Sequence, residues 1–137
     1  MGTASTMACI TETLGMALPG TAAIPAIHAD RLRAAEASGA QAVHLAQIDR
    51  DKQLTPKKII TPASVENALR ILLAVGGSTN AIIHLTAIAG RLGIPIPLQQ
   101  LNKLSDETPV LIDLKPTGDH YMEDLFKAGG SASCLEN

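Results

Sequence analysis

Apolar positions recur at helical spacing along most of this sequence. Where the spacing is regular and turn residues mark both ends, the pattern predicts a helix. On that basis we expect four longer helices and two short ones, over residues 1–18, 26–49, 62–75, 78–92, 98–104 and 119–128.

The boundaries are clearest around the third and fourth helices. Thr61-Pro62 combines a capping hydroxyl with a proline at the first helical position, which favours a helix start. Gly76-Gly77 ends the third helix, Ser78 begins the fourth, and Gly93 ends it. The apolar stripes of the two helices are expected to face a core: Val65, Ala68, Leu69, Leu72 and Val75, then Ala81, Ile82, Leu85, Ile88, Ala89 and Leu92.

The second predicted helix is longer and less apolar. Its inward stripe would consist of small and medium residues: Leu32, Ala35, Gly39, Ala42 or Val43, and Ala46. The charged stretch 49–58 that follows is expected to be a surface connection.

Residues 110–114 form a short apolar run between Pro109 and Pro116, which is typical of a strand. One strand cannot form a sheet alone, so its partners would lie outside this chain. The expected fold is therefore mainly helical, with one or two short strands.

Composition narrows the possible functions. Hydrophobic residues make up 46% of the chain and charged residues 18%, as in a folded soluble protein. Tyr121 and Phe126 are the two aromatic residues, and 11 basic residues against 13 acidic ones form no basic run, so nucleic-acid binding is not expected. We expect no membrane span and no signal peptide, hence a cytoplasmic protein, in which Cys9 and Cys134 are free thiols.

Two helix starts are candidate binding sites for a carboxylate or phosphate, because glycines admit a ligand close to the backbone and helix starts offer N–H donors. The alternative is that each is an ordinary turn and helix cap, which uses the same residue types. The candidate site residues are Gly2, Thr3, Ser5 and Thr6 at the first start, and Gly76, Gly77, Ser78, Thr79 and Asn80 at the second.

Other polar residues give weaker signals. The four histidines, His28, His44, His84 and His120, form no metal-binding pair, and His84 is expected to be a hydrogen-bonded core residue. Glu123 and Asp124 point in different directions on a helix, so they predict a favourable helix start rather than an acid–base pair. Cys9 is expected to be a small buried residue.

Four segments together resemble the dihydroxy-acid and phosphogluconate dehydratase family. They are Met-Gly-Thr-Ala-Ser-Thr-Met at the start, Ile27 to Arg31, Glu66 to Leu85 with its Gly-Gly-Ser-Thr-Asn-Ala, and Asp113 to Gly130 with its Asp-Leu-Lys-Pro-Thr-Gly and Met-Glu-Asp-Leu. Within the family, the first segment is similar to the sugar-acid branch, the arabinonate and xylonate dehydratases.

The resemblance implies an α/β/α N-terminal domain of a homo-oligomeric enzyme that dehydrates a 2,3-dihydroxy sugar acid to a 2-keto-3-deoxy acid, with an iron–sulfur cluster ([2Fe–2S] or [4Fe–4S]) and Mg²⁺. It also implies that residues 1–137 are an internal fragment, without the cluster cysteines and without the β-rich C-terminal domain. No catalytic or metal-binding residue of the family then lies on this chain, and no cofactor is expected to bind it alone. A stand-alone helical remnant or interaction protein is the alternative.

Overall fold

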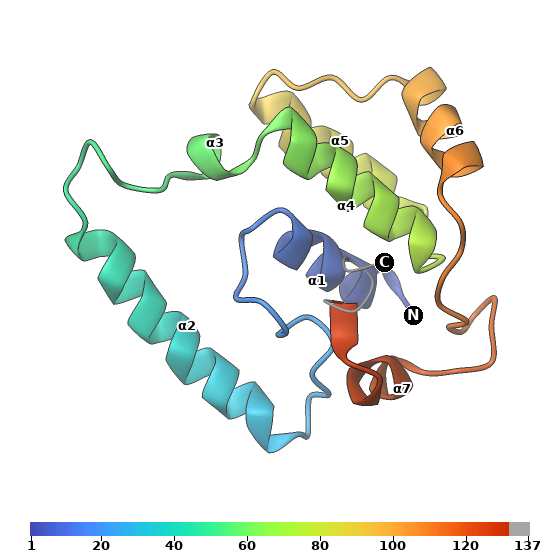
Figure 1. Cartoon of the computed structure of the whole chain (residues 1–137), viewed down its shortest axis with the longest axis horizontal. Coiled ribbons are helices and arrows are strands. Elements are labelled where there is room, and N and C mark those ends of the chain that lie inside the picture. The colour runs from blue at the N-terminus through green and yellow to red at the C-terminus, as the bar shows by residue number, and fades with distance from the viewer. Residues whose placement is uncertain (132–137) are drawn as a thin grey trace.

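A computed structural model describes residues 1–131 and shows a helical fold (Figure 1). The helices of this described part are α1 (Thr3–Thr13), α2 (Ala29–Gln47), α3 (Pro56–Ile59), α4 (Pro62–Ala74), α5 (Asn80–Arg91), α6 (Leu98–Glu107) and α7 (Met122–Lys127). None of them is long and apolar enough to cross a membrane.

The main core lies between α1, α4, α5 and α6. The stripe predicted for α4 is confirmed, because all five of its residues are buried, and Ala81, Leu85 and Ala89 of α5 are fully buried against it. Ile10 of α1, Leu14 directly after α1, and Leu104 of α6 complete this core. Each fully buried aliphatic side chain of this core contributes roughly 1.5–3 kcal/mol to stability.

Caps fix where α4 and α5 begin and end. The Thr61 hydroxyl accepts a hydrogen bond from the Ser64 N–H (3.2 Å), and the Ser64 hydroxyl accepts one from the Thr61 N–H (2.8 Å), which completes a reciprocal cap. Gly93 ends α5 with a left-handed φ of +73°.

Ion pairs also join α4 to α6. The Arg70 guanidinium of α4 contacts Glu66 on the same helix (3.0 Å) and Glu107 on α6 (3.4 Å). The hydrogen bond to Glu66 is the main cause that raises the pKa of Arg70.

The predicted first helix is too long. Helix α1 ends at Thr13, because Gly15 turns the chain with a φ of +80°. The Glu12 carboxylate then accepts hydrogen bonds from the backbone N–H groups of Gly20 (3.0 Å) and Ala22 (2.7 Å) and from the hydroxyl of Ser131 (2.7 Å). One carboxylate thus joins α1, the loop after it and the segment after α7.

The predicted strand over residues 110–114 is wrong. Residues 1–131 contain no strand, and only an isolated bridge joins Leu114 to His120. The N–H groups of Leu111 (2.8 Å) and Ile112 (3.3 Å) donate to the carbonyl of Ala74 at the end of α4. The apolar run therefore lies against a helix end, and two of its N–H groups find an acceptor there without a neighbouring strand.

The inward stripe predicted for the second helix is also wrong. Helix α2 lies at the edge of the molecule (Figure 1), and none of its 19 residues is buried. Leu32, at the head of that stripe, is 77% exposed.

Candidate functional site

The two helix starts proposed as binding sites contact each other, although more than 70 residues separate them. The N–H of Ser78 donates to the hydroxyl of Thr6 (3.0 Å), and the hydroxyls of Ser78 and Thr3 lie 2.9 Å apart. The side-chain amide of Asn80 donates to the hydroxyl of Thr3 (3.2 Å). Thr6 is fully buried, and its own hydroxyl donates to the Gly2 carbonyl (2.9 Å). The two starts thus form one polar cluster.

Gly76 and Gly77, the two glycines of the turn, have different structural roles. Gly76 has a φ of +59°, a conformation that favours glycine, and it ends α4. Gly77 makes room for α1: a Cβ atom placed there would lie 2.7 Å from Thr6 Cγ2 and 2.8 Å from Leu72 Cδ1. The group that lies close to Gly77 is therefore the Thr6 side chain and not a ligand. An ordinary turn and helix cap explains why both positions are glycine.

Several donors of the cluster remain available to a ligand. Helix α1 has no side-chain cap, so the first N–H groups of this helix, those of Thr3, Ala4 and Ser5, lack a hydrogen-bond acceptor among residues 1–131. Within the same range, the hydroxyls of Ser5 and Thr79 make no hydrogen bond, and Thr79 is exposed. By contrast, the N–H groups of residues 80, 81 and 82 at the start of α5 are already bonded to the oxygens of Ser78 and Thr79. The start of α1 is thus the better anion-binding end.

A third segment, residues 113–120, lies beside this cluster. The amino group of Met1 donates to the carbonyl of Lys115, and a Cβ atom at Gly76 would lie 3.6 Å from the Thr117 hydroxyl. The Lys115 ammonium donates to the Tyr121 hydroxyl (2.7 Å) and lies 4.1 Å from the centre of the Tyr121 ring. Sequence reasoning identified this segment by resemblance but did not place it next to the helix starts.

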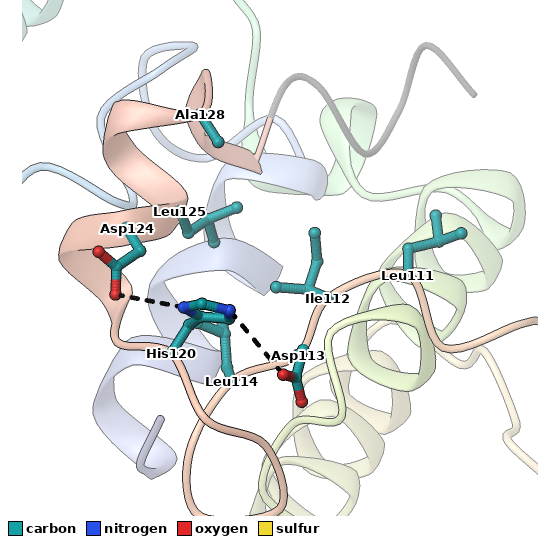
Figure 2. Close-up of a pocket in the computed structure, with 8 residues that line it drawn as sticks. All are labelled: Leu111, Ile112, Asp113, Leu114, His120, Asp124, Leu125 and Ala128. Atoms are coloured by element: carbon teal, nitrogen blue, oxygen red, sulfur yellow. Dashed lines mark ion pairs between the residues drawn. The ribbon is translucent and has the colours of Figure 1, made fainter.

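The same segment forms part of the wall of a hollow of about 270 Å³ (Figure 2). At its mouth, His120 lies between two carboxylates, with Nε2 4.0 Å from Asp113 and Nδ1 4.0 Å from Asp124. The other lining residues are Leu111, Ile112, Leu114, Leu125 and Ala128. The histidine is 64% exposed, so each pair contributes little unless it is shielded from water.

Sequence reasoning treated His120 as isolated and Asp124 as a helix-start residue. The signal that it missed is the tight turn that brings Asp113 back to His120. In this turn the N–H of Gly118 donates to the Leu114 carbonyl (2.9 Å), and the N–H of His120 donates to the Asp113 carbonyl (3.0 Å). His84, predicted to be a core residue, is exposed, because α5 turns its neighbour Leu85 to the core.

The described residues do not fit an iron–sulfur cluster or a Mg²⁺ site. Clusters need several thiolates, and Cys9 is fully buried in α1 among Ile71 and Val75, which confirms its prediction as a small buried residue. Residues 1–131 contain no group of three or more His, Cys, Asp and Glu side chains that could hold a metal. Cys134 lies outside the described residues.

Comparison with known proteins defines the class to which this helical domain belongs. A family model described as dihydroxy-acid/6-phosphogluconate dehydratase N-terminal matches residues 1–137. The chain therefore belongs to this dehydratase N-terminal family.

Individual relatives agree with the family match. The chain is 50% identical to a dihydroxy-acid dehydratase of Methanospirillum hungatei, over 93% of this chain and 23% of the relative. It is 45% identical to that of Thermodesulfovibrio yellowstonii and 48% identical to that of Methanococcoides burtonii, each over 99% of this chain and 24% of the relative. The chain spans about a quarter of the length of these relatives, and their names do not point to the sugar-acid branch.

Proposed function

We propose that this chain forms part of the N-terminal domain of a hydro-lyase that dehydrates a 2,3-dihydroxy acid to a 2-keto acid. The family match over the whole chain supports the proposal. Because the relatives named as dihydroxy-acid dehydratases are about four times as long, the activity would belong to a larger protein, and the chain alone would be inactive.

The observation that carries the role of this chain within such an enzyme is the joining of the two helix starts by Thr3, Thr6 and Ser78. Their hydrogen bonds fix the start of α1 and leave its N–H groups and the Ser5 and Thr79 hydroxyls open. Such donors suit a carboxylate or hydroxyl oxygen, and the helix dipole adds a favourable term for an anion. In the complete enzyme, this cluster would orient the acid substrate.

The resemblance implies that an iron–sulfur cluster and Mg²⁺ would serve the complete enzyme. Because the described residues offer no ligand set, their contribution would be the orientation of neighbouring groups by hydrogen bonds. The other partners would be the remainder of the enzyme and further subunits, in the cytoplasm.

A chimaera tests this role. In it, the present chain replaces the matching quarter of the Methanospirillum hungatei dehydratase. If the proposal holds, the chimaera dehydrates a 2,3-dihydroxy acid, and Ser5→Ala together with Thr79→Val raises KM about tenfold, which corresponds to about 1.4 kcal/mol of lost binding. The matched control is Thr86→Val, an exposed position on α5, which should leave KM and kcat unchanged.

An inactive but folded chimaera would contradict the dehydratase role. An active chimaera with unchanged KM in the double variant would contradict the orienting role of the cluster. The same chimaera, assayed with a pentonic acid beside a branched-chain dihydroxy acid, tests the sugar-acid specificity predicted from the Met1–Met7 segment.

A stand-alone helical protein is the second candidate, because one contiguous core joins α1, α4, α5 and α6 within this chain. A self-sufficient domain would unfold cooperatively as a monomer. Unfolding without a cooperative transition would exclude this candidate.

A further inference from the structure

A carboxylate holds one side of the loop between α1 and α2, residues 20–24. The Glu12 side chain, which is half-buried, accepts hydrogen bonds from the N–H groups of Gly20 (3.0 Å) and Ala22 (2.7 Å). It also accepts one from the hydroxyl of Ser131 (2.7 Å), a residue that is 1% exposed. Hydrogen bonds to an ionised acceptor are roughly twice as strong as those between neutral groups, so these three bonds fix the loop firmly.

A guanidinium holds the same loop from its other side. Arg31, at the start of α2, donates to the carbonyls of Thr21 (3.3 Å) and Ile24. A guanidinium binds two acceptors at once because its donors form a rigid fork. Sequence reasoning identified the segment Ile27 to Arg31 by resemblance and gave it no role, and here its last residue fixes a loop.

Loop 20–24 packs against a segment that borders the polar cluster. Ala23 is 4% exposed and belongs to one buried cluster with Leu114 and Leu125, where the loop passes beside α7 (Figure 1). A Cβ atom at Gly130 would lie 3.7 Å from the Ala23 Cβ, so the segment after α7 packs on the same loop. The loop is therefore a support for segment 113–120.

Segment 113–120 in turn contacts both helix starts of the polar cluster. The carbonyl of Lys115 accepts a hydrogen bond from the amino group of Met1, directly before α1. The Thr117 hydroxyl lies 3.6 Å from the place of a Cβ atom at Gly76, in the turn before α5. Because packed interiors leave few voids, a shift of this segment would displace its neighbours at both helix starts.

We propose that Glu12 and Arg31 are positioning residues, which fix loop 20–24 and thereby hold segment 113–120 against the polar cluster. The inference rests on the proposed function, since it assigns both residues to the site that would orient the acid substrate. Contact alone does not establish energetic coupling, so the coupling has to be measured.

Native-state hydrogen exchange measures the coupling at single amides of the 137-residue chain. The N–H groups of Gly118 and His120 are hydrogen-bonded within segment 113–120 and report its local opening. The N–H of Leu69, in the middle of the buried helix α4, reports global unfolding. A residue that only stabilises the whole chain would change exchange at Leu69 at least as much as in the turn.

Two substitutions remove the contacts with little change in size. Glu12→Gln replaces one acceptor oxygen by an NH₂ group, which accepts nothing, so at least one of the three bonds is lost. Arg31→Lys replaces the fork that reaches two carbonyls by a single ammonium. In each variant, exchange at Gly118 and His120 should become about tenfold faster relative to exchange at Leu69.

Glu36→Gln and Arg33→Lys are the matched controls. Both positions are exposed on α2, and Arg33 contacts Asp30 instead of the loop, so neither control should change the exchange ratio. If Glu12→Gln does not fold, Ser131→Ala takes its place, because it removes one of the three bonds and leaves the carboxylate intact. Equal exchange ratios in the variants and the controls would overturn the proposal.

The chimaera with the Methanospirillum hungatei dehydratase separates this inference from the proposed function. In an active chimaera, Glu12→Gln should raise KM several-fold and change kcat by less than about twofold, as expected for a loss of substrate binding. Faster exchange in the turn with an unchanged KM would refute the positioning role. An inactive chimaera would contradict the proposed function, and the exchange ratios would still decide whether the two residues hold segment 113–120.

Discussion

Thr6 and Gly77 are predicted to be energetically coupled, because the methyl group of Thr6 occupies the place where a side chain at residue 77 would begin. Gly77→Ala would bring its Cβ to 2.7 Å from Thr6 Cγ2 and 2.8 Å from Leu72 Cδ1. Overpacking of this kind costs about 1–3 kcal/mol, and the loss of unfolded-state entropy returns about 0.4–1 kcal/mol. We expect Gly77→Ala to lower the free energy of unfolding by about 1–2 kcal/mol.

Two substitutions at Thr6 separate the methyl group from the hydroxyl. Thr6→Ser removes the clashing methyl at a cost of about 1 kcal/mol and keeps the acceptor for the Ser78 N–H. Thr6→Val keeps the methyl but leaves that N–H unpaired, which costs about 1–3 kcal/mol. The loss of unfolding free energy caused by Gly77→Ala should therefore be about 1 kcal/mol smaller in the Thr6→Ser background than in the original chain. In the Thr6→Val background, Gly77→Ala should cause the same loss as in the original chain.

Urea unfolding followed by far-UV circular dichroism measures all six proteins of the two double-mutant cycles. The slope of the free energy against urea should stay the same, so that the midpoint reports stability. If the free-energy losses of Thr6→Ser and Gly77→Ala add within about 0.3 kcal/mol, the Thr6 methyl group is not what opposes a side chain at residue 77. That result would refute the predicted coupling.

Three further predictions concern the core, the tight turn and a surface pair. Leu85→Ala, at a fully buried position, should lower the free energy of unfolding by about 2–5 kcal/mol, as chemical denaturation would show. Ile83→Ala, at a position 70% exposed, should lower it by less than about 0.5 kcal/mol. Equal losses in the two variants would contradict the core assignment. Gly118→Ala should destabilise the chain by about 2–4 kcal/mol, since its Cβ would meet backbone atoms at 2.5 and 2.7 Å, and an unchanged thermal midpoint would contradict that geometry. The hydrogen bond to Glu123 raises the pKa of Lys127 above its ordinary 10.5, so the stabilisation is present below pH 10.5 and lost at higher pH. Glu123→Gln should lower this pKa, as an NMR titration of the Lys127 side chain would show.

The regular helices α4 and α5 were predictable because their signals are local. A capping hydroxyl, a proline at the first turn and a terminal glycine act within a few residues, and the apolar stripe of α4 is unbroken. The predicted burial of Val65 and Leu69 is therefore confirmed.

The errors arose where the outcome depends on distant partners. An apolar run such as 110–114 satisfies its backbone in a sheet or against a helix end, and here the carbonyl of Ala74 is the acceptor. The stripe of α2 has helical spacing whether it faces the same chain or another surface, so its burial could not follow from periodicity alone.

The candidate site was predicted in its parts and not in its assembly. Each helix start was identified from its glycines and hydroxyls, which act locally. The contact between Thr6 and Ser78 spans 72 positions and depends on how α1 packs against α4. The placement of His120 between Asp113 and Asp124 depends in the same way on the turn at Gly118, which spacing in the sequence does not reveal.

The contact between Lys115 and Tyr121 has a practical consequence for optical spectroscopy. Tyr121 is the one tyrosine of the chain, and the chain has no tryptophan. Its ring lies 4.1 Å from the Lys115 ammonium, on the segment beside the amino terminus and the turn at Gly76. Intrinsic fluorescence would therefore act as a local probe of this segment, and a change in emission without a change in helical circular dichroism would report movement there alone.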